Sequence, residues 1–257
     1  MSSPWGHLVI VCCHAFYVKD KNLSPLNEEA WHLKPFQRSH PKTNKTGEHE
    51  TFVEHILEAA RHGSGMENYV VFSGGKTDKT MGISESQSYK DAFSQLAVCG
   101  EPPSGRPLAP PRLGLEEHAT DSYQNLLFSI IKYRQTHGRY PERITVITHK
   151  FKARRFVELH AQAIRWPLDR IKVAGKDPPW ASQEEEAEVI AAEEENAMLP
   201  FRSDLYGVGE VLGGKRIARS WNPACLDEIC DGLEPEVQAL LRWNQPTLFD
   251  GALPWSE

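Results

Sequence analysis

Apolar residues follow two different spacings along the first 180 residues, and each spacing predicts a different kind of element. Short runs rich in Val and Ile predict buried strands at 7–13, 69–72, 144–147 and 170–174. Apolar positions three and four apart predict helices at 48–62, 85–98, 123–131 and 151–166. Strands that alternate with helices in this order indicate βαβ units. We therefore predict an α/β fold with a mostly parallel sheet.

Two segments depart from this alternation. Residues 18–46 form a long polar stretch between the first strand and the first helix, and we expect it to fold over the rim of the sheet as a lid. Residues 181–257 begin with a Glu-rich helix to about Met198 and continue as an irregular C-terminal extension. We predict one α/β domain over residues 1–180, with the helix and the extension of residues 181–257 packed on it.

Composition excludes several classes of protein. The chain has 257 residues, 40% hydrophobic content and a net charge of −6, which is ordinary for a globular protein. Seven glutamates lie between Glu184 and Glu195, so the rest of the chain carries about +1 (−6 + 7), and nucleic acid is not the expected partner. No apolar run reaches the roughly 20 residues of a membrane span. The early run 8–17 is interrupted by His14 and has no basic region before it, which predicts a buried strand and a soluble, cytoplasmic protein.

The cysteines and histidines do not predict a metal site. There are five cysteines and no Cys-x-x-Cys pair, so neither a disulfide framework nor a zinc site is indicated. Phosphate and dinucleotide loops are also missing. Gly75-Lys76-Thr77 lacks the required glycine five residues earlier, where Val70 stands, and no Gly-x-Gly-x-x-Gly follows the first strand.

Polar clusters follow several of the predicted strands, where parallel strands place their ligands. The clusters are Cys12-Cys13-His14, Ser73-Gly74-Gly75 with Glu85, Glu116 through Asn125, and Thr148 through Arg155. Glycines at the end of a strand permit a tight turn and a close approach of the backbone to a ligand. We expect these clusters to lie on one rim.

The last cluster places four bases, Lys150, Lys152, Arg154 and Arg155, at the start of a helix. Cations there oppose the helix dipole, so a bound phosphate or carboxylate would explain them. The alternative is that the bases are solvated and only one or two of them meet an acid of the chain.

Carboxylates and histidines of the same clusters could move a proton. Glu85 and Glu116 are candidates for a general acid/base pair, with His14 or His149 as a proton shuttle near neutral pH. Lys152 and Arg155 would hold the anionic group of the substrate. This hypothesis is a metal-free enzyme acting on an anionic or zwitterionic small molecule. The structural alternative is that the carboxylates cap helices and pair with Lys152 and Arg155.

The order of the clusters resembles the YdcF-like family, a domain family of unknown function. Its three blocks match Ser73-Gly74-Gly75 with Ser84-Glu85, then Glu116 with Ala119, Asp121, Ser122, Gln124 and Asn125, then Thr148 through Arg155. The chain departs from the family where Lys152 replaces His, His149 replaces Ser, and Cys12-Cys13-His14 replaces a glycine-rich turn. These replacements resemble a divergent, fungal branch with Thr-His-Lys-Phe-Lys.

The resemblance implies a Rossmann-like three-layer αβα sandwich with a rim pocket. It adds Asp121 and Asn125 to Ser73, Gly74, Gly75, Lys152 and Arg155 as ligand-binding residues. It also implies S-adenosylmethionine as a ligand, because a bacterial member of the family binds it, while the cofactor otherwise stays unknown. Two further functions are therefore open: a non-catalytic module for S-adenosylmethionine or a nucleotide, and an interaction protein whose Glu-rich helix binds a basic partner. The oligomeric state cannot be inferred.

Overall fold

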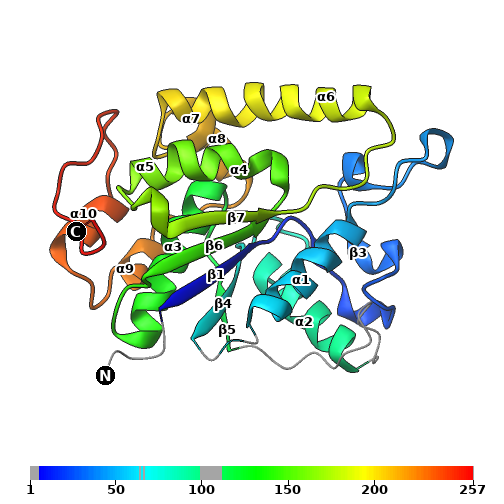
Figure 1. The fold of residues 1–257 in the computed structure, drawn as a ribbon, viewed down its shortest axis with the longest axis horizontal. Helices are drawn as coiled ribbons and strands as arrows, with labels where there is room; N and C mark the ends of the chain where they lie inside the picture. The colour runs from blue at the N-terminus through cyan, green and yellow to red at the C-terminus, as the bar shows by residue number, and fades with distance from the viewer. Residues whose placement is uncertain (1–5, 64, 66, 99–111, 257) are drawn as a thin grey trace.

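A parallel five-stranded sheet forms the centre of the protein (Figure 1). The computed structural model describes residues 6–63, 65, 67–98 and 112–256. The strand order is β5-β4-β1-β6-β7. The bounds are β1 (His7–Cys12), β4 (Asn68–Ser73), β5 (Leu113–Glu116), β6 (Arg143–Thr148) and β7 (Ile171–Gly175). Helices cover both faces of this sheet, so the predicted α/β class and three-layer αβα sandwich are confirmed.

Alternate residues of the buried strands face opposite layers of helices. Val9 and Val11 of β1 pack toward α1 (His49–Gly63) and α2 (Glu85–Val98). Leu8 and Ile10 pack toward α3 (Ser122–His137) and the helix that follows β6. Both sets are fully buried, as expected of a central parallel strand that is covered on both faces.

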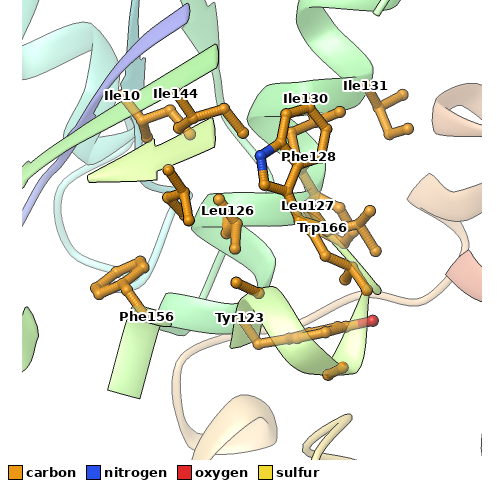
Figure 2. Packing of buried hydrophobic residues seen from close by; sticks show 14 of the residues in the cluster. Ile10, Tyr123, Leu126, Leu127, Phe128, Ile130, Ile131, Ile144, Phe156 and Trp166 are labelled. Atoms are coloured by element: carbon orange, nitrogen blue, oxygen red, sulfur yellow. The ribbon is translucent and has the colours of Figure 1, made fainter. Parts of the chain in front are cut away.

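The α3 layer contains the larger apolar cluster. Figure 2 shows Leu126 between the strand residues Ile10 and Ile144 and the aromatic ring of Phe156. Phe156 belongs to a continuous helical stretch made of η5 (Lys150–Lys152), α4 (Ala153–Arg155), η6 (Phe156–His160) and α5 (Ala161–Ala163). This stretch and α3 hold the two halves of the sheet together on this face.

The long segment after β1 is anchored to the domain by buried side chains. β2 (Phe16–Tyr17) pairs with β3 (Trp31–His32), and the rest consists of the short turns η1 (Lys19–Lys21), η2 (Glu28–Ala30), η3 (Pro35–Gln37) and η4 (Pro41–Thr43). The Trp31 indole is buried and donates to the Pro25 carbonyl at 2.8 Å. The Gln37 amide donates to the His14 carbonyl at 3.1 Å, which ties the segment to the end of β1.

The region after residue 180 is more regular than the sequence predicts. The Glu-rich helix α6 (Gln183–Glu193) continues through η8 (Glu194–Met198) into α7 (Leu199–Ser203), and three more helices follow: α8 (Glu210–Ala218), α9 (Cys225–Ile229) and α10 (Pro235–Leu241). The prediction of an irregular extension is wrong, because the extension forms helices. Their residues Leu212, Val237 and Leu240 are buried against the α3 layer.

The Glu-rich helix lies on the outside of the domain, away from the sheet (Figure 1). None of the α6 residues is buried, so α6 does not pack directly on the sheet. It runs along the outer side of α4 and α5, as Figure 1 shows in yellow, and the buried contacts begin only at Ala197 and Met198. Among the described residues, no helix is both long and apolar enough to cross a membrane.

The last residues of the chain contribute to the main core, which leads to a first prediction. Trp255 is 2% exposed, donates from its indole to the Ile164 carbonyl at 2.8 Å, and lies 4.9 Å from the Tyr140 ring. We expect Trp255→Ala to lower the free energy of unfolding by about 3–5 kcal/mol, because the large cavity forms in the shared core. Urea unfolding would measure this, with the half-exposed Leu248→Ala as the control. A loss as small as that of the control would show that the C-terminal segment is not part of the cooperative unit.

Candidate functional site

The strand order has a reversal at β1, and the polar residues gather there. The chain passes from β1 to β4 and β5 on one side, then to β6 and β7 on the other, so the connections leaving β1 and β6 diverge. In open α/β sheets, ligands bind in the crevice beyond the carboxyl ends of such strands. His14 follows β1, and Thr148 ends β6. The His14 Nε2 atom lies 3.2 Å from the Thr148 hydroxyl, which brings the two strand ends together.

A cluster of three histidines lies at these strand ends, a region that we call the crevice. The rings of His14 and His149 are 4.7 Å apart between centroids, and His55 of α1 lies 5.3 Å from His149. Burial lowers the pKa of all three, to about 4 for His55. The cluster is therefore neutral near pH 7. His149 Nδ1 and His55 Nδ1 are buried without a hydrogen-bond partner.

His14 and His149 are predicted site residues, whereas the sequence analysis missed His55. His55 stands beside Ile56 on the helix face that packs on the sheet, and its Nε2 atom lies 3.0 Å from the Lys176 carbonyl. The one signal in the sequence is a histidine inside an apolar stripe. That signal is ambiguous, because histidines on such faces are often only hydrogen-bonded core residues.

Lys152 extends toward the histidines from the helix after β6. Its ammonium lies 3.5 Å from His14 Nδ1 and 5.5 Å from the centre of the Phe151 ring. Burial and the neighbouring Arg155 lower the pKa of Lys152 to about 8. Within the part of the chain that the structure describes, no carboxylate lies within 4.0 Å of this ammonium.

The other bases of the predicted cluster have partners or face the solvent. Arg155 lies 3.1 Å from Glu193, and Arg154 lies 2.9 Å from Glu158 and 3.5 Å from Glu194. Lys150 is exposed. Two of the four bases thus meet acids of the chain, mainly from the Glu-rich helix. This agrees with the structural alternative for Arg154 and Arg155 and leaves Lys152 as the base at the centre of the crevice.

Glu116 lies in a closed network at the ends of β4 and β5. It is 4% exposed and accepts from the Ser73 hydroxyl at 2.5 Å and from the backbone N–H groups of His118 and Ala119 at 2.7 and 3.0 Å. The Asn125 amide donates to the Ser73 hydroxyl at 2.9 Å. Burial raises the pKa of Glu116 to about 7, although the hydrogen bonds oppose this rise. Its oxygens already have donors, so the contacts of Glu116 are structural.

Glu85 lies at the start of α2, beside the end of β4. Its carboxyl group accepts from the Thr77 hydroxyl and lies beside Gly74 and Cys13, the residue before His14. Burial raises the pKa of Glu85 to about 7. The residue as a whole is partly exposed, whereas its carboxyl group is desolvated.

The glycines of the Ser-Gly-Gly turn make close contacts within the chain. A Cβ on Gly74 would lie 2.8 Å from the Glu85 carboxyl oxygen, and a Cβ on Gly75 would lie 2.9 Å from the Ala119 carbonyl. The first N–H groups of α2 donate to the Gly75 and Gly74 carbonyls at 3.0 and 3.1 Å. Glycine is needed here for packing between the strand end and α2, and these N–H groups already have acceptors.

The C-terminal segment adds cations to the same rim. Asp121 caps α3 through the Gln124 N–H and accepts from the Arg216 guanidinium at 2.6 Å. Arg219 donates to the Thr120 carbonyl at 2.8 Å. The sequence analysis missed both arginines, because residue 216 lies 95 positions from Asp121 and no local pattern connects them.

The predicted residues therefore form two neighbouring groups. Ser73, Gly74, Gly75, Glu85, Glu116 and Asn125 surround the ends of β4 and β5, and His14, His149, Lys152 and Arg155 surround the ends of β1 and β6. Cys13, packed on Gly74, joins them. Asp121 faces the C-terminal segment. Among the described residues, no three His, Cys, Asp or Glu side chains are placed to hold a metal ion.

A small cavity lies outside this crevice. It measures about 130 Å³ and opens between the β5 end, α3 and α9, next to Glu116, His118 and Ile229. None of the histidines of the crevice lines it. We place the candidate site at the crevice, because strand topology and titratable groups coincide there.

Comparison with known proteins gives a relative but no family. No protein-family model matches the chain, and no solved structure matches it. The chain is similar to an uncharacterised protein of the yeast Saccharomyces cerevisiae, YOR238W, with 29% identity over 263 residues. The similarity covers 84% of this chain and 83% of the yeast protein.

The closed network around Glu116 predicts a large effect on stability. We expect Glu116→Ala to lower the free energy of unfolding by about 2–4 kcal/mol, because the Ser73 hydroxyl and two N–H groups lose their acceptor inside the protein. Urea unfolding would measure the change. The exposed Glu195→Ala serves as control and should change stability by less than about 0.5 kcal/mol.

The raised pKa of Glu85 predicts a pH-dependent effect. The folded protein holds the Glu85 proton up to about pH 7, whereas the unfolded chain loses it near pH 4.5, so this group lowers stability as the pH rises between these values. Glu85→Gln removes this loss. We expect the variant to gain about 1–3 kcal/mol relative to the parent at pH 8 and much less at pH 5, measured by urea unfolding at both values. Equal differences at the two pH values would contradict the raised pKa.

Proposed function

We propose that the chain is an enzyme that acts on a small anionic or zwitterionic molecule by acid/base chemistry at the ends of β1 and β6. The observation that carries this proposal is the contact between Lys152 and His14. A lysine ammonium with no carboxylate of residues 6–63, 65, 67–98 and 112–256 within 4.0 Å lies 3.5 Å from an imidazole at the reversal point of the sheet.

The charges around the crevice favour an anion. Arg155 shares its charge with Glu193, whereas no carboxylate among the described residues lies within 4.0 Å of Lys152, and Arg219 lies at the same rim. His14 and His149 have lowered pKa values and add no positive charge near pH 7. A phosphate or carboxylate next to Lys152 would balance a charge that the protein itself leaves unpaired.

Two groups at the crevice can exchange protons near neutral pH. Lys152 has its pKa lowered to about 8, and Glu85 has its pKa raised to about 7. Catalytic acids and bases work best when their pKa values lie near the working pH. His14, in contact with Lys152, would pass the proton between the amine and the substrate. Glu116 is not part of this proposal, because its oxygens are occupied.

The alternatives are less well supported. A module for S-adenosylmethionine or a nucleotide would use the Ser-Gly-Gly turn, but the space beside Gly74 and Gly75 is taken by the chain itself. An interaction role for the Glu-rich helix competes with the ion pairs of Glu193 and Glu194 inside the protein. Both remain predictions.

The remaining expectations are part of the same proposal. We propose a YdcF-like relationship, which the convergence of the Ser73, Glu85 and Glu116 blocks at one rim supports. We also propose a cytoplasmic protein without a nucleic-acid partner. The free cysteines Cys12, Cys13, Cys225 and Cys230 and the net charge of −6 support this.

The proposed anion site predicts ligand-dependent stabilisation that requires Lys152. We would measure the melting temperature with phosphate, sulfate, amino acids and small dicarboxylates. A ligand at a hundred times its Kd adds about 2.7 kcal/mol, which raises the melting temperature of a protein of this size by several degrees.

The variants decide whether the stabilisation arises at the crevice. We expect Lys152→Met to abolish it and Lys150→Met, which removes an exposed lysine of the same turn, to keep it. A stabilisation that survives in Lys152→Met, or none with any anion, would contradict the proposed function.

A further inference from the structure

Lys152 has an unusual environment for a lysine. Its neighbours come from several elements: Cys12 of β1, His14 after it, Glu48 before α1, His149 and Arg155 on its own segment, and Glu193 of α6. Its ammonium lies 3.5 Å from His14 Nδ1. The residue as a whole is partly exposed, whereas its ammonium is desolvated.

The lysine therefore lacks the features of a purely structural cation. A buried lysine is normally paired with a carboxylate, because an unpaired buried charge is costly. Here the carboxylate of Glu193 is paired with Arg155 at 3.1 Å, and Glu48 lies 3.8 Å from His149. Burial lowers the pKa of Lys152 to about 8, so a larger fraction of its amine is in the neutral, nucleophilic form near pH 7 than for an ordinary lysine.

We propose that Lys152 is a nucleophile that forms an imine with the carbonyl carbon of a small anionic aldehyde or 2-oxo acid. This inference rests on the proposed function and names its substrate class. Arg155 and Arg219 would attract the carboxylate of the substrate, and His14 would carry the protons.

The step balances with groups that are present. In the fraction of molecules whose Lys152 amine has released its proton to solvent, the nitrogen lone pair forms a bond to the carbonyl carbon while the carbonyl π electrons move to oxygen. His14 takes a proton from the positively charged nitrogen of this adduct and gives it to that oxygen, which becomes a hydroxyl. The nitrogen lone pair then forms the C=N bond as the C–O bond breaks, and the hydroxyl takes up one solvent proton and leaves as water, so that the protonated imine is formed. No oxidant or reductant is consumed.

Lys150 provides a matched comparison two residues away. It is exposed, and its Cα atom would lie 2.4 Å from a Cβ on Gly175, so its backbone is held against the end of β7. The two lysines share the same turn but differ in contact with His14. A difference in their reactivity would therefore arise from the surroundings of Lys152 at the strand ends and not from the local sequence.

The test is reductive trapping on the full chain with glyoxylate, a small anionic aldehyde. Sodium cyanoborohydride reduces the imine to a stable secondary amine, and peptide mass mapping locates it. At pH 7 we expect Lys152 to be labelled at least about tenfold faster than Lys150, since its pKa of about 8 gives it much more free amine than an ordinary lysine has. The labelling rate at Lys152 should level off above about pH 8.

Two variants and a neutral probe separate specific from general reactivity. Lys152→Arg should remove the fast label. His14→Gln should slow labelling of Lys152 and leave Lys150 unchanged, with the melting temperature of each variant checked to show that it is folded. Propionaldehyde, which has no anionic group, should label Lys152 more slowly than glyoxylate does. Equal rates at Lys152 and Lys150 would overturn the proposal.

Oxalate is an anion that cannot form an imine. Its binding therefore distinguishes a failure of the nucleophile proposal from a failure of the proposed anion site. Calorimetric binding of oxalate that is lost in Lys152→Met, together with no preferential labelling of Lys152, would overturn the nucleophile and keep the anion site. Absence of both would overturn the proposed function as well.

Discussion

The pairing of β1 between β4 and β6 is the constraint on which the rest of the rim depends. Parallel hydrogen bonds place Cys12 beside Ser73 and Val11 beside Ile147, so the residues that follow the three strands emerge at the same level. The chain then turns to opposite sides after β1 and β6. His14 and Thr148 consequently meet at the point where the two connections separate, and Lys152 extends over them from the next helical turn.

Burial sets the electrostatics of this crevice. The strand ends and the segment anchored by Trp31 and Gln37 exclude water from His14 and His149, which lowers their pKa values and keeps them neutral. The same exclusion of water lowers the pKa of Lys152 and raises that of Glu85. Desolvation disfavours the charged form of both kinds of group, so it brings a base and an acid toward the same pH range from opposite directions.

The Glu-rich helix and the C-terminal helices complete the charge pattern from outside the sheet. Glu193 and Glu194 neutralise Arg155 and Arg154, while Arg216 and Arg219 bind the start of α3. The Glu-rich segment has the composition of a solvated helix face, yet two of its glutamates form ion pairs at the rim. Because these carboxylates meet the arginines, the Lys152 ammonium has no carboxylate within 4.0 Å in the part of the chain that the structure describes.

The periodicity of apolar residues determined the fold class and most of the elements, because strands and helices bury faces with different spacings. It also determined that His14, Glu85, Glu116 and Lys152 would lie on one rim, since parallel strands end at the same edge. Tertiary structure alone decided which of them share a site. Glu116 meets Ser73 and two N–H groups, whereas Lys152 meets His14. Packing between segments that are distant in the sequence brings further residues to the site, namely His55, Glu193 and Arg219. No local spacing in the sequence encodes such contacts.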